Sequence, residues 1–161
     1  MTGTPAPLEV RFWSKVDKTD NCWNWNASRG TAGYGQISIG GRYGRPNLAH
    51  RVSYELVIGP IPDGMQVDHM CHNRICVNPA HLRLVTNKEN NEHRAGPQRN
   101  NTSGYNGVIK RSDCNRYAAQ ITHNGKHIYV GMFETAEEAD AAVTAKRLEL
   151  FTHNDIDRLA A

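Results

Sequence analysis

The fold of this chain is decided by residues 68–82, which read DHMCHNRICVNPAHL. Two short apolar segments, Met65–Asp68 and Leu82–Val85, flank this polar loop and are predicted to be strands. The capping box at Thr86–Glu89, in which a hydroxyl and a carboxylate satisfy free amides at a helix start, predicts a helix over residues 87–94. We therefore expect the order strand, polar loop, strand, helix.

Cysteine and histidine recur in this loop at a spacing that suits a metal ion. Cys71, Cys76 and His81 follow one another at intervals of five residues. Thiolates and an imidazole around a tight loop are the ligands of tetrahedral Zn²⁺. Cys22 is the natural fourth ligand, because Cys114 belongs to another part of the chain. The alternative is that the cysteines are small buried hydrophobic residues.

Oxygen donors are expected at the same place. Asp68 ends the first strand and Asn90 lies one turn into the following helix, so their oxygens can converge on a divalent cation such as Mg²⁺. His69, adjacent to that ion, could remove a proton from water. An isolated Asp-His pair is more often a surface hydrogen bond, and it is the surrounding spacing that favours a catalytic site.

A stretch rich in glycine, proline and small polar residues divides the chain into two modules. Of the 161 residues, 39% are hydrophobic and 22% are charged, which excludes fibrous and wholly disordered proteins. Residues 96–102 lie in a stretch rich in Gly, Pro, Asn and Ser that is typical of a linker. This linker would separate residues 1–95 from residues 103–151, with residues 152–161 as a C-terminal tail.

Upstream of the loop, Tyr34–Ile39 and Arg42–Leu48 are predicted to form a hairpin, and Ala49–Ile58 a short helix. No run approaches the ~18 apolar residues of a membrane helix, and the first residues lack the basic end and apolar stretch of a signal peptide. We therefore expect no membrane association and no secretion. The expected location is the cytoplasm.

The second module has the pattern of a small sheet and a helix. Gly107–Lys110, Arg116–Thr122 and Lys126–Val130 are predicted strands, and Asn124-Gly125 is a hairpin turn between the last two. A capping box at Thr135–Glu138 opens a helix with a stripe of alanines that can lie close to a sheet. The expected fold class is α+β, a zinc-braced module followed by a three-stranded antiparallel sheet packed on one helix.

Three motifs of the first module resemble a known family. Asp68-His69, Asn78–His81 and Val85–Asn90 follow the ββα-metal motif of HNH endonucleases, specifically those of phage and intron homing enzymes. The spacing from His69 to the cysteines is also similar to that of His-Cys box homing endonucleases, which brace the same finger with zinc. The resemblance implies a homing-type, site-specific endonuclease that hydrolyses DNA and leaves 5′-phosphate and 3′-hydroxyl ends.

The resemblance also implies a role for each of these residues. His69 would be the general base, and Asp68 and Asn90 would bind the catalytic Mg²⁺. In many HNH enzymes an Asn at the position of His81 orients the base. Because His81 is expected on zinc here, we expect a backbone carbonyl to orient His69 instead. The implied ligands of a structural Zn²⁺ are Cys22, Cys71, Cys76 and His81.

His-Cys box enzymes use an arginine near the scissile phosphate. Arg42 is our first choice, with Arg29, Arg45 and Arg51 as alternatives, and Arg42 and Arg51 are the predicted DNA contacts of the first module. The alternative for each of these arginines is an ordinary phosphate contact or a solvated side chain. His50 lies next to Arg51, and both a structural and a functional role are open for it.

The second module resembles the Apetala/ethylene-response-factor DNA-binding domain through most of residues 102–150, on the motifs Ser103–Val108, Tyr117–Ile121 and Tyr129–Ala142. That family lays its sheet in the major groove with the helix behind, which implies that outward strand residues contact DNA. Arginine can read guanine, glutamine can read adenine, and lysine and threonine can hold phosphates. The predicted contacts are Asn106, Lys110, Arg111, Arg116, Gln120, Thr122, Lys126, His127 and Tyr129.

Together the two resemblances predict a cleavage module joined to a module that concentrates DNA near it. The expected partner is double-stranded DNA, and a homodimer is possible. The resemblance to phage enzymes implies the cytoplasm of a bacterial or phage-infected cell, or its nucleoid. One alternative is a restriction endonuclease of the same chemistry. Another is a catalytically silent DNA-binding regulator that keeps the finger as a scaffold. The second module could also bind protein, or nothing.

Overall fold

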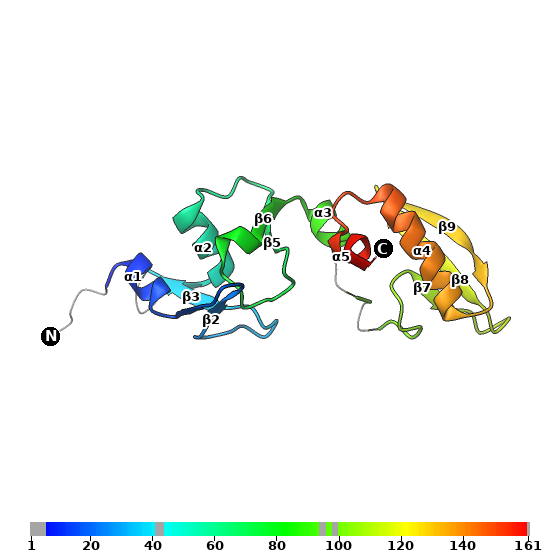
Figure 1. Ribbon diagram of the computed structural model, residues 1–161, viewed down its shortest axis with the longest axis horizontal. Helices are drawn as coiled ribbons and strands as arrows, with labels where there is room; N and C mark the ends of the chain where they lie inside the picture. The colour runs from blue at the N-terminus through cyan, green and yellow to red at the C-terminus, as the bar shows by residue number, and fades with distance from the viewer. Residues whose placement is uncertain (1–5, 41–43, 94–95, 98–99, 161) are drawn as a thin grey trace. The chain divides into compact units, whose positions relative to one another are not determined.

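The computed structural model describes residues 6–40, 44–93, 96–97 and 100–160 (Figure 1). The chain divides into two compact units, Met1–Thr86 and Asn87–Ala161. In both units helices accompany small antiparallel sheets, which agrees with the expected α+β class. Across the described ranges, no helix has the length and apolar character to cross a membrane.

The first unit is an assembly of short elements. Its strands pair as antiparallel two-stranded sheets, β1 with β2, β3 with β4 and β5 with β6. The elements in chain order are α1 (Leu8–Trp13), β1 (Val16–Lys18), β2 (Trp23–Trp25), β3 (Gln36–Ile39), β4 (Arg45–Leu48), α2 (Ala49–Val57), β5 (Gln66–His69), the 3₁₀ turn η2 (Pro79–His81) and β6 (Leu82–Val85).

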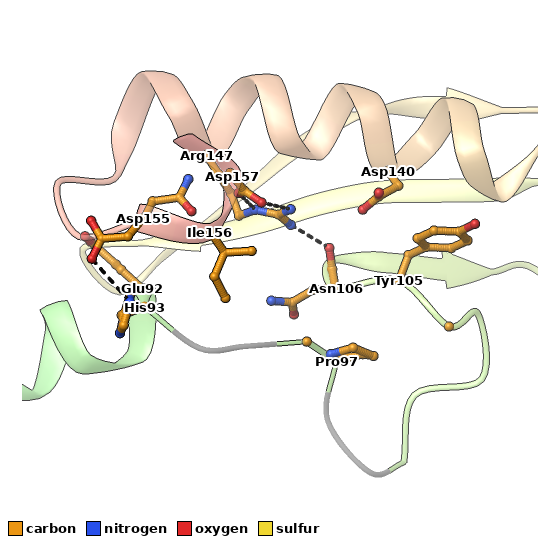
Figure 2. Close-up of a pocket in the computed structure, with 13 residues that line it drawn as sticks. Glu92, His93, Pro97, Tyr105, Asn106, Asp140, Arg147, Asp155, Ile156 and Asp157 are labelled. Atoms are coloured by element: carbon orange, nitrogen blue, oxygen red, sulfur yellow. Dashed lines mark hydrogen bonds and ion pairs between the residues drawn. The ribbon is translucent and has the colours of Figure 1, made fainter. Parts of the chain in front are cut away.

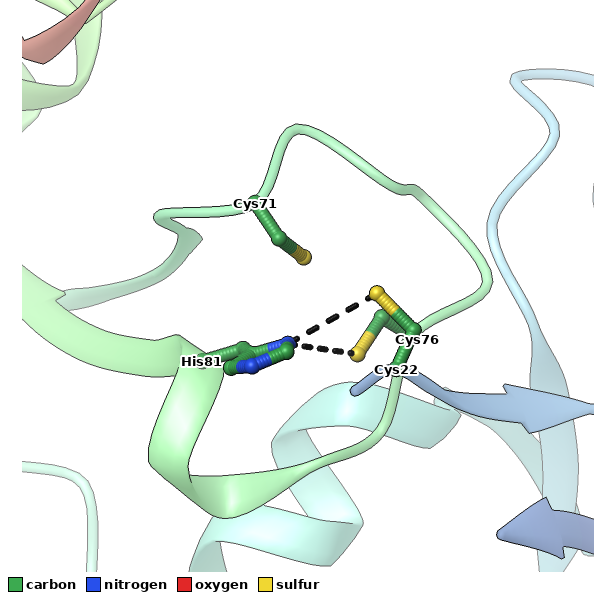
Figure 3. Close-up of side chains that lie close together, drawn as sticks. All are labelled: Cys22, Cys71, Cys76 and His81. Carbon is green, nitrogen blue, oxygen red and sulfur yellow. Dashed lines mark hydrogen bonds between the residues drawn. The ribbon is translucent and has the colours of Figure 1, made fainter. Parts of the chain in front are cut away.

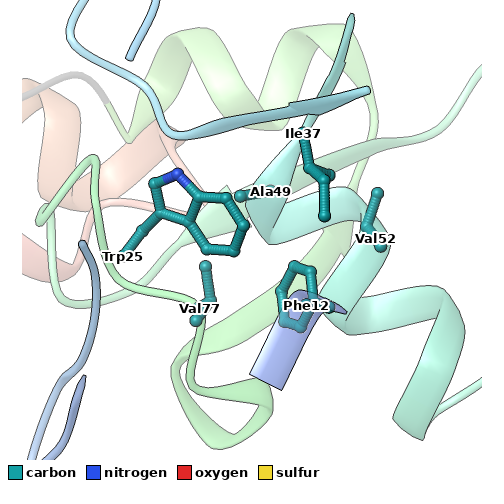
Figure 4. Close-up of a cluster of buried hydrophobic side chains, with 6 residues drawn as sticks. All are labelled: Phe12, Trp25, Ile37, Ala49, Val52 and Val77. Carbon is teal, nitrogen blue, oxygen red and sulfur yellow. The ribbon is translucent and has the colours of Figure 1, made fainter. Parts of the chain in front are cut away.

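A small aromatic core joins these elements (Figure 4). The Trp25 ring is fully buried, and its centroid lies 5.1 Å from that of Phe12 on α1. Gly35 lies so close that a Cβ there would come within 2.6 Å of the Trp25 ring, so the position requires glycine. The core residues are Phe12, Trp25, Ile37, Ala49, Val52 and Val77.

The hairpin expected around residues 68–82 is present. β5 pairs with β6 in antiparallel register, with Asp68 opposite Arg83 and His69 opposite Leu82. Val67 and Leu82 pack on Tyr54 of α2 in a second apolar cluster. The α2 helix therefore supports the hairpin that presents His69.

The second unit contains the expected sheet and helix. The sheet has the order β7-β8-β9, and the capping box at Thr135 and Glu138 opens α4 as predicted. Val108 and Ala119 of the sheet are buried against Ala139 and Val143 of α4. The elements are α3 (Asn87–Glu92), β7 (Val108–Lys110), β8 (Tyr117–His123), β9 (Lys126–Phe133), α4 (Ala136–Leu150) and α5 (Asp155–Ala160).

Two features of this unit differ from the expected organisation. Helix α3 groups with the second unit, because the Glu92 carboxylate accepts a hydrogen bond of 3.1 Å from the Thr152 amide. The residues expected as a tail form α5, which Arg147 holds through its ion pair with Asp157. The boundary between the compact units thus falls after Thr86 in the chain, before the predicted linker at residues 96–102. Residues 98–99 of that linker lie outside the described residues.

Candidate metal centre and active site

Loops from distant parts of the first unit meet at the predicted zinc ligands (Figure 3). Cys22 lies between β1 and β2, Cys71 and Cys76 lie between β5 and β6, and His81 ends η2. Asn78 fastens these loops together, because its Nδ2 donates to the Asn21 carbonyl at 2.8 Å while its Oδ1 accepts from the Ala80 amide at 3.1 Å.

The four donor atoms have the spacing of a tetrahedral metal site. His81 Nδ1 lies 3.6 Å from both Cys22 Sγ and Cys76 Sγ, and all four donors lie within 4.8 Å of one another. Zinc bonds of ~2.3 Å to sulfur and ~2.0 Å to nitrogen place tetrahedral S and N ligands about 3.5 Å apart. The residues present therefore fit a metal ion of this kind.

The pKa values of Cys71 and Cys76 shift in opposite directions. A hydrogen bond from the Cys76 thiol lowers the pKa of Cys71, and the same bond raises the pKa of Cys76. The Cys71 thiolate is the form that binds metal. The ligand set expected from the sequence is thus brought together in the structure, with Cys114 exposed in the other unit.

His69 ends β5 and is oriented by the metal-binding loop. Its ring is buried, and Nε2 lies 2.9 Å from the backbone carbonyl oxygen of Cys76. A carbonyl oxygen only accepts, so Nε2 carries the proton and Nδ1 of the neutral ring is left to accept one. Burial lowers the pKa of His69, which favours that neutral form. The expected backbone partner of His69 is therefore present.

Asp68 is paired with a residue that the sequence reasoning missed. The residue is only 9% exposed, and Oδ2 accepts a hydrogen bond of 3.1 Å from Nε of Arg83. The two residues face each other across the β5–β6 ladder. A cation bound by Asp68 would share the carboxylate with this arginine. Cross-strand register, once the hairpin had been predicted, was the signal that could have found Arg83.

Asn90 lies on α3 in the second compact unit, and its placement is described within that unit alone. Asp68 and His69 are neighbours on β5, whereas the role of Asn90 stays a prediction. Arg42 lies outside the described residues. Arg51 is half-buried in the first turn of α2, and Arg29 and Arg45 are exposed.

The buried His50 ring packs against the ring of His69. Its ring is 4% exposed, and its centroid lies 4.5 Å from that of His69 in an edge-to-face contact. The Tyr34 ring lies 5.4 Å from His50 and 5.9 Å from His69. The pKa of His50 falls to about 3, chiefly because the ring is buried and further because His69 and Arg51 lie nearby. His50 is therefore neutral at physiological pH.

The strand register in the second unit sorts the predicted DNA contacts between two faces of the sheet. Ala119 is buried under α4, so the next residue, Gln120, points away from the helix. Gln120 lies opposite Tyr129, which is 63% exposed, and Thr122 lies opposite His127. These predicted contacts share the outer face: Gln120, Thr122, His127 and Tyr129.

Other predicted contacts lie elsewhere. Lys110 follows Val108 by two residues, which puts it on the helix side of the sheet, 5.9 Å from the Tyr117 ring. The backbone carbonyl of Asn106 accepts a hydrogen bond of 2.9 Å from Arg147 of α4. Arg111 is exposed and pairs with Asp113 at 2.9 Å, which lowers the pKa of Asp113 to about 2. Arg116 and Lys126 are exposed.

A pocket of about 200 Å³ in the second unit lies where α3, α4 and α5 meet (Figure 2). Arg147 forms hydrogen bonds of 2.6 and 3.2 Å to the Asp157 carboxylate, and His93 lies 3.3 Å from Asp155. Glu92 and Asp140 add further negative charge to the lining. This acidic lining does not suit a DNA phosphate, and the ion pair of Arg147 with Asp157 fastens α5 to α4.

Comparisons with known proteins match the region of the candidate site. Residues 47–92 match the family model of an HNH endonuclease. An uncharacterized HNH endonuclease of Acanthamoeba polyphaga mimivirus is 31% identical over 150 residues, which cover 92% of this chain and 72% of that protein. No solved structure matches.

Two phage proteins are similar over shorter stretches. Protein 7.7 of Escherichia phage T7 is 38% identical over 73 residues, 45% of this chain and 54% of that protein. Protein 2.8 of the same phage is 33% identical over 84 residues, 52% of this chain and 56% of that protein. The chain thus spans little more than half the length of these two relatives.

Proposed function

Because the chain belongs to the HNH endonuclease family, we propose that it is a metal-dependent DNA endonuclease whose general base is His69. The observation that carries this proposal is the 2.9 Å hydrogen bond from His69 Nε2 to the Cys76 carbonyl. That bond fixes the tautomer in which Nδ1 can accept a proton from water, next to the carboxylate of Asp68.

The chemistry is hydrolysis of a phosphodiester. His69 Nδ1 takes a proton from water as the water oxygen bonds to phosphorus. The bond from phosphorus to the 3′ oxygen breaks with its electron pair, and that oxygen takes a proton from solvent. The products are a 5′-phosphate and a 3′-hydroxyl. A Mg²⁺ ion held by Asp68 and Asn90 would stabilise the negative charge that develops on the phosphate.

We assign the metal held by Cys22, Cys71, Cys76 and His81 as a structural Zn²⁺. Four protein ligands would leave a tetrahedral ion no open position for water. The ion would hold the loop that presents the Cys76 carbonyl to His69. The zinc site thus serves catalysis through the orientation of the base.

The second unit is proposed to bind double-stranded DNA through its sheet. The outer face carries Gln120, Thr122, His127 and Tyr129, residue types that contact bases and phosphates. The family match ends at residue 92, and no comparison supports the resemblance to the Apetala/ethylene-response-factor domain. The DNA-binding role of this sheet therefore rests on residue types and register alone.

We propose a homing-type enzyme, with a restriction enzyme as the alternative. The phage origin of two relatives suits a protein that acts inside an infected cell. Nucleoid association has no further support. Nothing in the described ranges supports the possible homodimer, and we do not propose one. A silent regulator is disfavoured because Asp68 and His69 are both retained.

Incubation of the full chain with supercoiled plasmid tests the proposed function. Nicked or linear DNA should appear with Mg²⁺ and disappear with EDTA. The ends should carry 5′-phosphate, read by direct ligation of the products. A folded, zinc-loaded protein that binds the plasmid but leaves it uncut with either Mg²⁺ or Mn²⁺ would be the regulator instead.

A further inference from the structure

Helix α3, which carries the proposed metal ligand Asn90, contains no apolar side chain. Its residues from Asn87 to Glu92 read NKENNE, so hydrophobic packing of its side chains cannot hold it in place. The helix is only six residues long, and an isolated helix of that length is not stable in water. Polar contacts with other segments must therefore stabilise α3.

Such contacts come from the segment Thr152–Asp155, which follows α4. The Glu92 carboxylate is buried, and it accepts hydrogen bonds from the amide of Thr152 at 3.1 Å and from its hydroxyl at 3.4 Å. Nδ1 of His153 lies 3.6 Å from the Glu89 carboxylate. The segment therefore contacts two carboxylates that lie three residues apart on one side of the helix.

The C-terminal end of α3 is held by the same segment (Figure 2). The His93 amide extends the helical pattern, because it donates to the Glu89 carbonyl at 3.0 Å. The His93 side chain is only 1% exposed, and its Nε2 lies 3.3 Å from the Asp155 carboxylate. His123 of β8 lies 3.7 Å from the Glu92 carboxylate and adds a contact with the sheet. The second unit thus anchors α3 from its second residue pair to its end.

We propose that Thr152, His153 and Asp155 are positioning residues, which keep α3 folded so that Asn90 can bind the catalytic cation. This inference rests on the proposed role of Asn90 as a ligand. A helix that is folded for only part of the time lowers the apparent affinity of its ligand for the ion by that fraction. The second unit would then serve the cleavage reaction as well as DNA binding.

A double substitution in the full chain, His153→Ala with Asp155→Ala, tests the anchoring and leaves every proposed metal ligand in place. Amide exchange across α3, measured without DNA or Mg²⁺, should speed about tenfold, while exchange in β8 should not change. Asp155→Asn should keep part of the protection, because its amide oxygen can still accept a hydrogen bond from His93. The control is Glu149→Ala, an exposed carboxylate on α4 that pairs with Lys146.

The dependence of cleavage on Mg²⁺ links this anchoring to the reaction. In single-turnover plasmid cleavage, the Mg²⁺ concentration for half-maximal rate should rise about threefold in the double variant. The rate at saturating Mg²⁺ should stay near that of the wild type, because the bound ion restores the order of the helix. Mn²⁺ titrated into the protein without DNA should broaden the Asn90 amide resonance, and the double variant should need about three times more of it.

Unchanged exchange in α3, or an unchanged metal requirement, would overturn the positioning role and leave His69 as the proposed base. A wild-type protein that cuts no DNA would instead refute the proposed function. The exchange and Mn²⁺ measurements would then decide the positioning role by themselves, since neither depends on cleavage.

Discussion

Loss of one metal ligand should unfold the first unit and leave the second unit folded. Cys22→Ser removes the ligand that lies between β1 and β2, while the other three lie in or beside the loop between β5 and β6. The metal is therefore a cross-link between segments about 50 residues apart in sequence. Without it, these short strands depend on a small aromatic core.

The expected magnitudes decide the outcome. At ~0.05–0.15 kcal/mol per residue, a unit of the size of Met1–Thr86 has a stability of about 4–13 kcal/mol. Structural zinc contributes about 10–16 kcal/mol in isolated zinc-finger peptides. Half of that contribution, about 5–8 kcal/mol, is comparable to the whole stability of the first unit, so Cys22→Ser should unfold much or all of it.

Tryptophan fluorescence reports this unfolding selectively. The tryptophans of this chain, Trp13, Trp23 and Trp25, all lie in the first unit, and Trp25 is fully buried. Emission should shift to the red in Cys22→Ser and after zinc chelation, while amide exchange in β8 stays slow. Cys114→Ser is the matched control, since its thiol is exposed in the second unit. A Cys22→Ser protein with one zinc per chain and native emission would refute the assignment.

Three further outcomes are expected. Glu92→Ala should speed amide exchange across α3, by the equivalent of ~1–3 kcal/mol, because the Thr152 amide loses its acceptor. The control is Glu149→Ala, an exposed carboxylate on α4 that pairs with Lys146, and equal exchange in the two variants would contradict the anchoring. Asn90→Ala should slow cleavage with partial rescue at higher Mg²⁺, and a rate insensitive to metal in both proteins would count against Asn90 as a ligand. His50 has a folded pKa of about 3 and an unfolded pKa near 6.5, so its stabilising contribution is complete above pH 6.5 and declines as the pH falls. Between pH 7.5 and 5.5 the wild type should therefore lose about 1 kcal/mol more stability than His50→Phe, and parallel pH curves in denaturant titrations would contradict this.

The metal centre could be predicted from the sequence because so few residue types bind zinc. Cys71, Cys76 and His81 lie close together in the sequence. Cys22 could be chosen as the fourth ligand because the remaining cysteine, Cys114, lies in the other module. The sequence could predict that a backbone carbonyl orients His69, but not which residue supplies it. Its identity as Cys76 depends on how the loop closes around the metal, which spacing does not encode.

Other features depend on contacts between distant residues. The segments α1, β1 and β2 are too short to show a periodicity, and packing around Trp25 stabilises them. The polar stretch after Asn90 has the composition of a linker. Glu92 in this stretch is nevertheless buried, and its carboxylate accepts a hydrogen bond from the Thr152 amide. The sequence could not place His50, because its ring packs against the ring of His69, nineteen residues away.

The central claim, that His69 is the base of a nuclease, is tested most directly by single-turnover cleavage of plasmid by His69→Ala. The control is His72→Asn in the same loop, because residue 72 has a φ of 54° that asparagine tolerates. His69→Ala should cut about 100 to 10,000 times more slowly than the wild type while keeping its zinc and its tryptophan emission, and His72→Asn should cut normally. A His69→Ala protein that keeps more than roughly a tenth of the wild-type rate would contradict the claim.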